Sequence, residues 1–178
     1  DGELKTTNNR RETLITVSRG GLKVAYFDVA RHEQRFIRKL NQTARIQLDL
    51  QVIPGGAARS QFKFDPKLFE PRAFDVYIIG DVPASAFKSR GKDSFLEELA
   101  SRVQEGAGLA MLGGVHNYDA GGYADSPIGP LLPVRLDQPA TTTVDPQRHV
   151  THKVQMLPTP EGESHYLMQL SPADNDSA

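Results

Sequence analysis

The strongest constraint on the fold is a set of short, nearly continuous apolar runs separated by segments of a different period. LKVAYFDV (22–29), FDVYIIGDVP (74–83) and GLAMLGG (108–114) have the composition of strands that are covered on both faces. IQLDLQVIP (46–54) instead alternates apolar and polar residues, as expected of a half-exposed edge strand. Strands that alternate with helical segments predict a parallel sheet between helices, here a three-layer α/β sandwich.

Two helices are predicted between these strands. The first covers ARHEQRFIRKLNQTA (30–44), with Phe36, Ile37 and Leu40 at helical spacing on the inner side. The second opens with a capping box formed by Ser94 and Glu97 and ends near Gly106. Its predicted inner face comprises Phe95, Leu96, Leu99, Ala100 and Val103. DPKLFEPRAF (65–74) predicts one helical turn before Pro71.

The length of 178 residues predicts one domain with attached segments. We expect residues 1–20 to be a linker or the last strand of a preceding domain, and 21–178 to be the domain itself. Its core is predicted at 21–134, with short strands and loops over 135–178 and a last strand at 165–170. The polar, abrupt ends indicate a piece excised from a longer protein.

Composition excludes several classes of function. The net charge of −1 gives no field for nucleic acid or an anionic membrane. The absence of cysteine excludes disulfides, a thiolate nucleophile and cysteine-ligated metal. No apolar run reaches the ~20 residues of a membrane span, so we expect no direct insertion of this segment. A glycine-rich phosphate fingerprint is absent after the first strand, where DVARHE stands, so no dinucleotide site is expected.

In parallel α/β folds ligands bind at the carboxyl ends of the strands. The predicted rim is therefore Asp28, Gly80-Asp81 and the turn Gly113–His116. If Asp28, Glu33 and Asp81 converge there, they could perform acid–base chemistry or hold a divalent cation. We favour the alternative of capping and ion pairing, for example of Glu33 with Arg31 or Arg35.

The turn after the fourth strand is the main candidate for function. Gly113 and Gly114 allow a tight bend, and a following helix would leave backbone N–H groups for an anion or oxyanion. His116 is either a general base or metal ligand, or simply a polar loop residue. Asn117, Tyr118 and Tyr123 either bind a polar ligand or stabilise the turn and pack the loop, which we favour.

The remaining serine and histidine candidates are in sequence contexts that do not favour catalysis or metal binding. Ser126 lies in no Gly-x-Ser-x-Gly elbow, and Ser126-Pro127 favours the start of a helix or turn. His149 and His152, with Asp145 nearby, lie in a β-branched segment where the two imidazoles would point to opposite faces. We therefore predict no metal site and no cofactor.

Four segments together carry a resemblance to a known family. KVAYFDVARHEQRFIRKL, FDVYIIGDVP, FLEELASRVQEGAGLAMLGG and GGYADSPIGPLLPV resemble the glutamine amidotransferase-like domain of large bacterial, notably planctomycete, membrane proteins. The resemblance covers residues 12–170. It implies a flavodoxin-like fold of the class I glutamine amidotransferase type.

The chain departs from that family's catalytic pattern at two places. Class I amidotransferases carry the nucleophile in a Gly-x-Cys-x-Gly turn, onto which Gly113, Val115 and Asn117 fall. Valine has no nucleophilic atom, so a thioester route is closed. The family's late His-x-Glu pair is matched only by His165, because Leu167 stands in the place of the glutamate.

The expected function follows from this departure. We expect a non-catalytic module that binds a small polar ligand or other domains of the same polypeptide, within a membrane-anchored bacterial protein. Predicted binding residues are Asp28, Glu33, Asp81, Gly113, Gly114, Val115, His116, Asn117 and Tyr123. The alternative is an amide or ester hydrolase, or an amidotransferase, that uses His116 and the turn's N–H groups. A third hypothesis, that the chain is a sugar-utilisation-type relative of the same fold, rests on topology alone.

Overall fold

The computed structural model describes residues 21–43, 45–88, 95–137, 152–155, 157–163 and 165. The chain divides into two compact units, residues 1–142 and 143–178. The sheet belongs to the first unit, and the described part of the second contains the short helix α3 (Pro160–Glu163). Residues 1–20, predicted as a linker or the last strand of a preceding domain, lie outside the described residues. So do the capping Ser94 and all but the first residue of the predicted strand 165–170.

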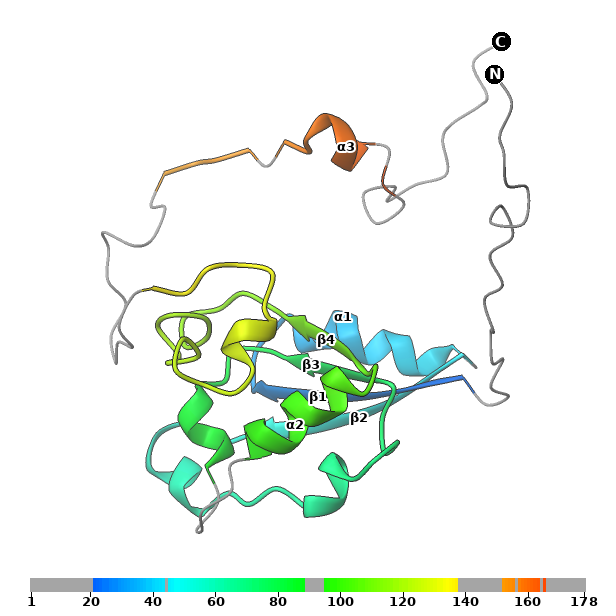
Figure 1. Ribbon diagram of the computed structural model, residues 1–178, viewed down its shortest axis with the longest axis vertical. Helices are drawn as coiled ribbons and strands as arrows, with labels where there is room; N and C mark the ends of the chain where they lie inside the picture. The colour runs from blue at the N-terminus through cyan, green and yellow to red at the C-terminus, as the bar shows by residue number, and fades with distance from the viewer. Residues whose placement is uncertain are drawn as a thin grey trace, which may run out of the picture. The chain divides into compact units, whose positions relative to one another are not determined.

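Four parallel strands form the sheet, which confirms the predicted α/β class (Figure 1). They are β1 (Leu22–Val29), β2 (Ile46–Ile53), β3 (Val76–Ile79) and β4 (Gly108–Met111). Their order is β2-β1-β3-β4, so β2 lies at an edge, as its alternating pattern predicts. Because β2 lies on one side of β1 and β3 on the other, the carboxyl ends of β1 and β3 flank the point where the strand order reverses.

An aromatic core fills one face of the sheet. Ala25, Phe27, Tyr77 and Ile79 point to this face because side chains alternate along a strand. The ring of Phe27 lies 5.3 Å from that of Phe64, 5.6 Å from Phe69 and 5.5 Å from Phe87, measured between centroids. Phe64, Phe69 and Phe87 come from the segment between β2 and α2, so this face holds the long connections in place.

The helix α2 (Phe95–Gln104) packs on the same core (Figure 1). Leu96, Leu99 and Ala100 are buried, as their helical spacing predicts. The helix ends at Gln104, and Gly106, two residues further on, has a φ of +110° that favours glycine. The Ala107 N–H donates to the Arg102 carbonyl at 3.0 Å. The predicted stop is confirmed.

A helix is present in the first predicted segment, but it is shorter than predicted and turns a different face inward. The helix α1 covers only Gln34–Arg38 and continues as a 3₁₀ turn, Lys39–Gln42. Phe36, predicted to face inward, is 56% exposed and lies under the Arg35 guanidinium, 4.6 Å from the ring centroid. The buried residue is Gln34, whose Nε2 donates to the Val29 carbonyl at 2.6 Å. A polar bond to the end of β1 therefore sets the helix's orientation.

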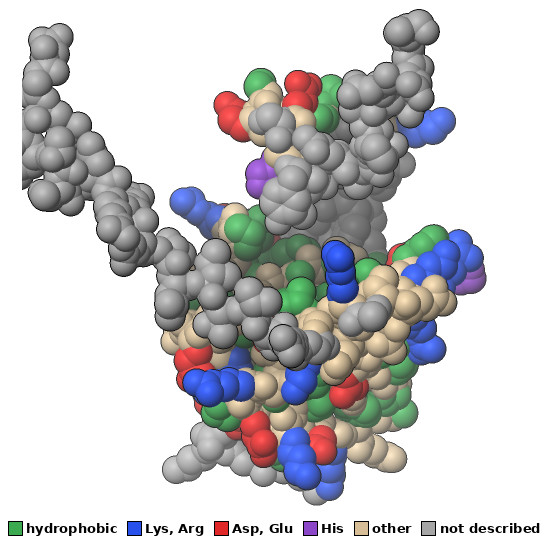
Figure 2. Space-filling model, turned by 90° about the vertical axis from the view of Figure 1, so that its right-hand side faces the viewer, with side chains coloured by type: hydrophobic (Ala, Val, Ile, Leu, Met, Phe, Trp, Pro, Cys, Tyr) green, Lys and Arg blue, Asp and Glu red, His purple; other side chains and the backbone are tan. Residues whose placement is uncertain are grey.

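The surface at the end of the sheet where the strands begin has mixed positive and negative charges. Figure 2 views this end and shows Lys and Arg side chains interspersed with Asp and Glu.

Within the described part of the chain, no helix has the length and apolar character that crossing a bilayer requires.

Candidate functional site

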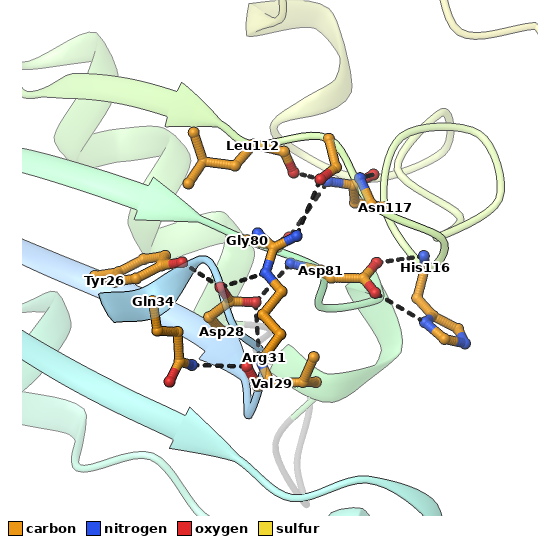
Figure 3. Close-up of polar contacts among 12 residues, drawn as sticks. Tyr26, Asp28, Val29, Arg31, Gln34, Gly80, Asp81, Leu112, His116 and Asn117 are labelled. Carbon is orange, nitrogen blue, oxygen red and sulfur yellow. Dashed lines mark hydrogen bonds and ion pairs between the residues drawn. The ribbon is translucent and has the colours of Figure 1, made fainter. Parts of the chain in front are cut away.

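The polar side chains of the predicted rim meet at the carboxyl end of the sheet (Figure 3). Asp28 lies near the end of β1, Asp81 follows β3, and His116 and Asn117 lie in the loop after β4. Parallel strands bring these three chain segments to one edge. Hydrogen bonds connect all three, as the following contacts show.

Asp28 is the buried centre of this network. Its carboxylate has no exposed surface and accepts hydrogen bonds from the Tyr26 hydroxyl, the Val29 N–H at 2.9 Å, Arg31 Nε at 2.8 Å and the Asp81 N–H at 2.8 Å. Burial, together with the adjacent Asp28 carboxylate, raises the pKa of Tyr26. A buried carboxylate that accepts four hydrogen bonds has no surface left for a substrate.

Gly80 provides the space that this carboxylate needs. A Cβ atom at position 80 would lie 2.2 Å from Cγ of Asp28. The Gly80 N–H also donates to the Phe27 carbonyl at 2.7 Å, extending the pairing of β3 with β1. The N–H groups of Gly80 and Asp81 therefore connect the ends of β3 and β1, one through the Phe27 carbonyl and the other through the Asp28 carboxylate. Glycine is the residue that fits at position 80.

Asp81 orients the histidine of the next loop. Its Oδ1 accepts the His116 N–H at 2.5 Å, and its Oδ2 lies 3.2 Å from Nδ1 of the His116 ring. A Cβ atom at Gly114 would lie 2.4 Å from Oδ1, so this glycine is required for the contact. The His116 side chain is 44% exposed, and Nε2 lies on the side of the ring away from Asp81 (Figure 3).

Asn117 holds the turn after β4 together. Its side chain is buried, accepts the Gly114 N–H at 3.1 Å and donates to the carbonyls of Leu112 and Gly80. No helix follows this turn in the described residues 112–128, where the chain continues through further turns. The N–H groups of Gly114 and His116 are thus bonded internally instead of forming an anion site.

The tyrosines of the loop have structural contacts. Tyr123 is fully buried and donates to the Val82 carbonyl at 2.6 Å, and this burial raises its pKa. Tyr118 has a left-handed φ of 51°, and its hydroxyl donates to the Met111 carbonyl at 2.9 Å. Ser126 Oγ donates to the Tyr123 carbonyl at 2.8 Å. Together these bonds fold the loop back against the ends of β3 and β4.

A cavity of about 710 Å³ opens beside this network, and we call it the carboxyl-end cleft. Its lining comprises Val29, Gly55, Gly56, Arg59, Asp81, Pro83, Ala84, Ser85, Lys88, His116, Ala120, Gly121 and Gly122. The volume lies within the range of about 300–1,000 Å³ that small-molecule sites occupy. The lining residues come from the last residue of β1 and from the segments that follow β2, β3 and β4. Ligands of parallel α/β proteins bind at this end of the sheet.

The structure separates the predicted site residues into groups. Asp28, Asp81, Gly114, His116 and Asn117 form one network, and of these Asp81 and His116 line the cleft.

Glu33 does not join them. It is exposed before α1 and makes no capping hydrogen bond, and Arg31 forms the ion pair with Asp28 at 2.8 Å instead of pairing with Glu33. Arg31 Nη1 also donates to the Gly113 carbonyl at 3.1 Å, so a cation rather than a further acid binds Asp28 and the turn.

Val115, Tyr123 and His165 take other positions. Val115 lies in the bend after β4 and is 38% exposed, without lining the cleft. His165 is an exposed residue of the second unit. Tyr123 is enclosed beneath the loop. Of the weak metal candidates, His149 and Asp145 lie outside the described residues. The described part of the chain contains no group of three side chains that could hold a metal ion.

Arg59 and Lys88 are cleft residues that the sequence patterns did not indicate. Arg59 lies in a 3₁₀ turn, Gly56–Gln61, and Lys88 follows another, Ala84–Phe87. Their positions in the chain could have indicated them, because each lies in the connection that follows the carboxyl end of a strand, β2 for Arg59 and β3 for Lys88.

Comparisons with known proteins add no relative. Neither the protein-family models, nor the curated proteins, nor the solved structures contain a match to this chain.

Proposed function

We propose that the chain is a non-catalytic, amidotransferase-like α/β module that binds a small polar ligand in the carboxyl-end cleft. The strand order β2-β1-β3-β4 supports the flavodoxin-like fold of this proposal. We propose that the module is part of a larger, membrane-anchored bacterial protein, and that its ligand binding affects its contacts with other domains of the same polypeptide.

The observation that carries this proposal is that the turn after β4 has no nucleophilic side chain at Val115 and that the N–H groups on either side of Val115 form hydrogen bonds within the protein. Val115 supplies a hydrocarbon side chain there, and the flanking N–H groups of Gly114 and His116 are bonded to Asn117 and Asp81. Acyl transfer requires an attacking atom and donors aimed at the developing oxyanion. A turn that supplies neither favours binding over covalent catalysis.

The cleft itself keeps the features of a binding site. Val29, Pro83 and Ala84 give it an apolar wall, while Gly55-Gly56 and Gly121-Gly122 bring bare backbone to its surface. Apolar walls with a few polar groups are typical of small-molecule sites.

We expect ligand mapping to find this cleft. In ¹⁵N NMR titrations of the whole chain with a panel of neutral and charged fragments, the largest shift changes should fall on the amides of Gly55, Gly56, Gly121 and Gly122. Amides around Arg72 and Gly106, which line another cavity at the opposite end of the sheet, serve as the internal control. Shifts confined to that end, or none at all, would refute the proposed binding site.

Hydrolysis of an ester or amide is a second candidate, and one contact favours it. His116 Nδ1 lies 3.2 Å from Asp81 Oδ2 and the ring lines the cleft, as a general base oriented by an acid would. This candidate requires turnover that disappears in His116→Ala. The bonded N–H groups of the turn count against it, because they leave the oxyanion without these two donors.

A further inference from the structure

The carboxyl-end cleft has a surplus of positive charge. Arg59 and Lys88 reach it from separate loops, and Asp81 is the single carboxylate among the described residues of its lining. Asp81 is already engaged by the N–H and the ring of His116. The chain as a whole has a net charge of −1, so this local surplus is not a consequence of overall composition.

Two further cavities of the sheet unit lack this surplus. The one of about 570 Å³ near the beginning of the strands is lined by Arg72 and Arg102 together with Asp75 and Glu105. The one of about 240 Å³ beside β4 is lined by apolar residues and Tyr118. The cationic character therefore coincides with the cleft at the strands' carboxyl ends.

Among the described residues, Arg59 makes its side-chain hydrogen bond through Nε, which leaves the two terminal nitrogens for a ligand. Its Nε donates to the Pro54 carbonyl at 3.3 Å, and its own carbonyl accepts the Phe62 N–H at 3.1 Å. The side chain is half-buried, and the residue lines the cleft. The two terminal nitrogens of a guanidinium form the planar fork that matches a carboxylate or phosphate.

Gly55 leaves open space at the surface of the cleft. Its φ of −85° and ψ of 171° are extended values that any residue adopts, and a Cβ atom there would meet no protein atom within 4 Å. Neither backbone conformation nor packing therefore requires glycine at this position. Its backbone lines the cleft, where a missing side chain leaves room for a ligand to approach closely.

We propose that the ligand of this cleft carries a carboxylate or phosphate group bound by Arg59 and Lys88, with an apolar body against Val29, Pro83 and Ala84. This inference rests on the proposed binding function and names the chemical class of its ligand. The anionic group lies against the Arg59 fork, and Gly55 leaves the space beside it.

Three probes of similar shape test the ligand class on the whole chain. Benzoate and phenyl phosphate carry the two candidate anions, and benzamide is the neutral counterpart of benzoate. By ¹⁵N NMR titration we expect at least one anion to bind about tenfold or more tightly than benzamide, as a charge-assisted bond implies. A preference for phenyl phosphate would identify the phosphate source, and a preference for benzoate the carboxylate source.

Variants separate the ligand class from the binding function. Arg59→Gln should remove most of the preference for the anion, and Lys88→Gln should reduce it. Lys67→Gln makes the same charge change at an exposed position outside the cleft and should leave affinity unchanged. Gly55→Ala adds a side chain in the open space of the cleft and should weaken anion binding several-fold.

Each remaining outcome overturns the inference in a recognisable way. If benzamide binds the cleft as tightly as the anions, the binding function stands and the anionic ligand class is wrong. If no probe shifts the cleft amides, the ligand class is also wrong. The broader fragment panel then decides the binding function separately. If the anions bind but Arg59→Gln and Lys67→Gln lose affinity equally, the attraction is unspecific and the assigned site is wrong.

Discussion

Replacing Asp28 with alanine is expected to lower the free energy of unfolding by about 3–5 kcal/mol. The carboxylate is fully buried and accepts bonds from Tyr26, Val29, Arg31 and Asp81. Its removal leaves buried donors unsatisfied and the Arg31 guanidinium without its partner. Urea unfolding followed by far-ultraviolet circular dichroism measures this loss, because the chain has no tryptophan for fluorescence.

Asp49→Ala is the matched control for this variant. Asp49 is an exposed residue of β2, the strand paired with β1, and its Oδ1 accepts a bond from Gln51 Nε2 at 2.6 Å. Exposed substitutions of this kind change stability by about 0.5 kcal/mol or less. Similar losses for Asp28→Ala and Asp49→Ala would show that Asp28 is not the centre of the rim network.

Gly121→Ala is expected to destabilise the chain by about 1–3 kcal/mol and to displace His116. A Cβ atom at this position would lie 2.3 Å from the His116 carbonyl oxygen and 2.7 Å from Cα of Asn117. These are backbone atoms, so the loop must open to relieve the contact. The Gly121 carbonyl also accepts the Ala84 N–H at 2.9 Å, which connects this displacement to the opposite wall of the cleft.

Two measurements check this expectation. Thermal unfolding should show the lower stability, and ¹⁵N NMR should show shifts at His116 and Ala84. Gly113→Ala is the control in the same loop, because a Cβ atom there meets nothing within 4 Å. Equal behaviour of the two variants would contradict the close packing of the loop after β4.

The sheet could be predicted because strands have a local pattern of apolar residues. The apolar run of β1 is nearly continuous and its central residues are buried, while β2 alternates and lies at one edge. β4 also has a continuous apolar run, although it lies at the other edge and is only partly buried. The first helix could not be predicted in the same way. Phe36, Ile37 and Leu40 fit a helical face, but the Gln34–Val29 hydrogen bond turns a different side inward.

The candidate site was predictable only in part. Asp28 and Asp81 follow from their places at strand ends, but the sequence does not tell that Arg31 rather than Glu33 completes the cluster. Both residues are within five positions of Asp28, and the short turn before α1 decides between them. Arg59 and Lys88 reach the cleft through the folding of long connections, which leaves no periodic signal.

The most direct test of the central claim is turnover by the purified chain, measured as ammonia release from glutamine and acid release from a panel of esters. The account predicts no release above the buffer rate for either the wild type or His116→Ala, together with retained fragment binding in the carboxyl-end cleft. Turnover by the wild type that is lost in His116→Ala would contradict it, because the His116–Asp81 pair would then be catalytic.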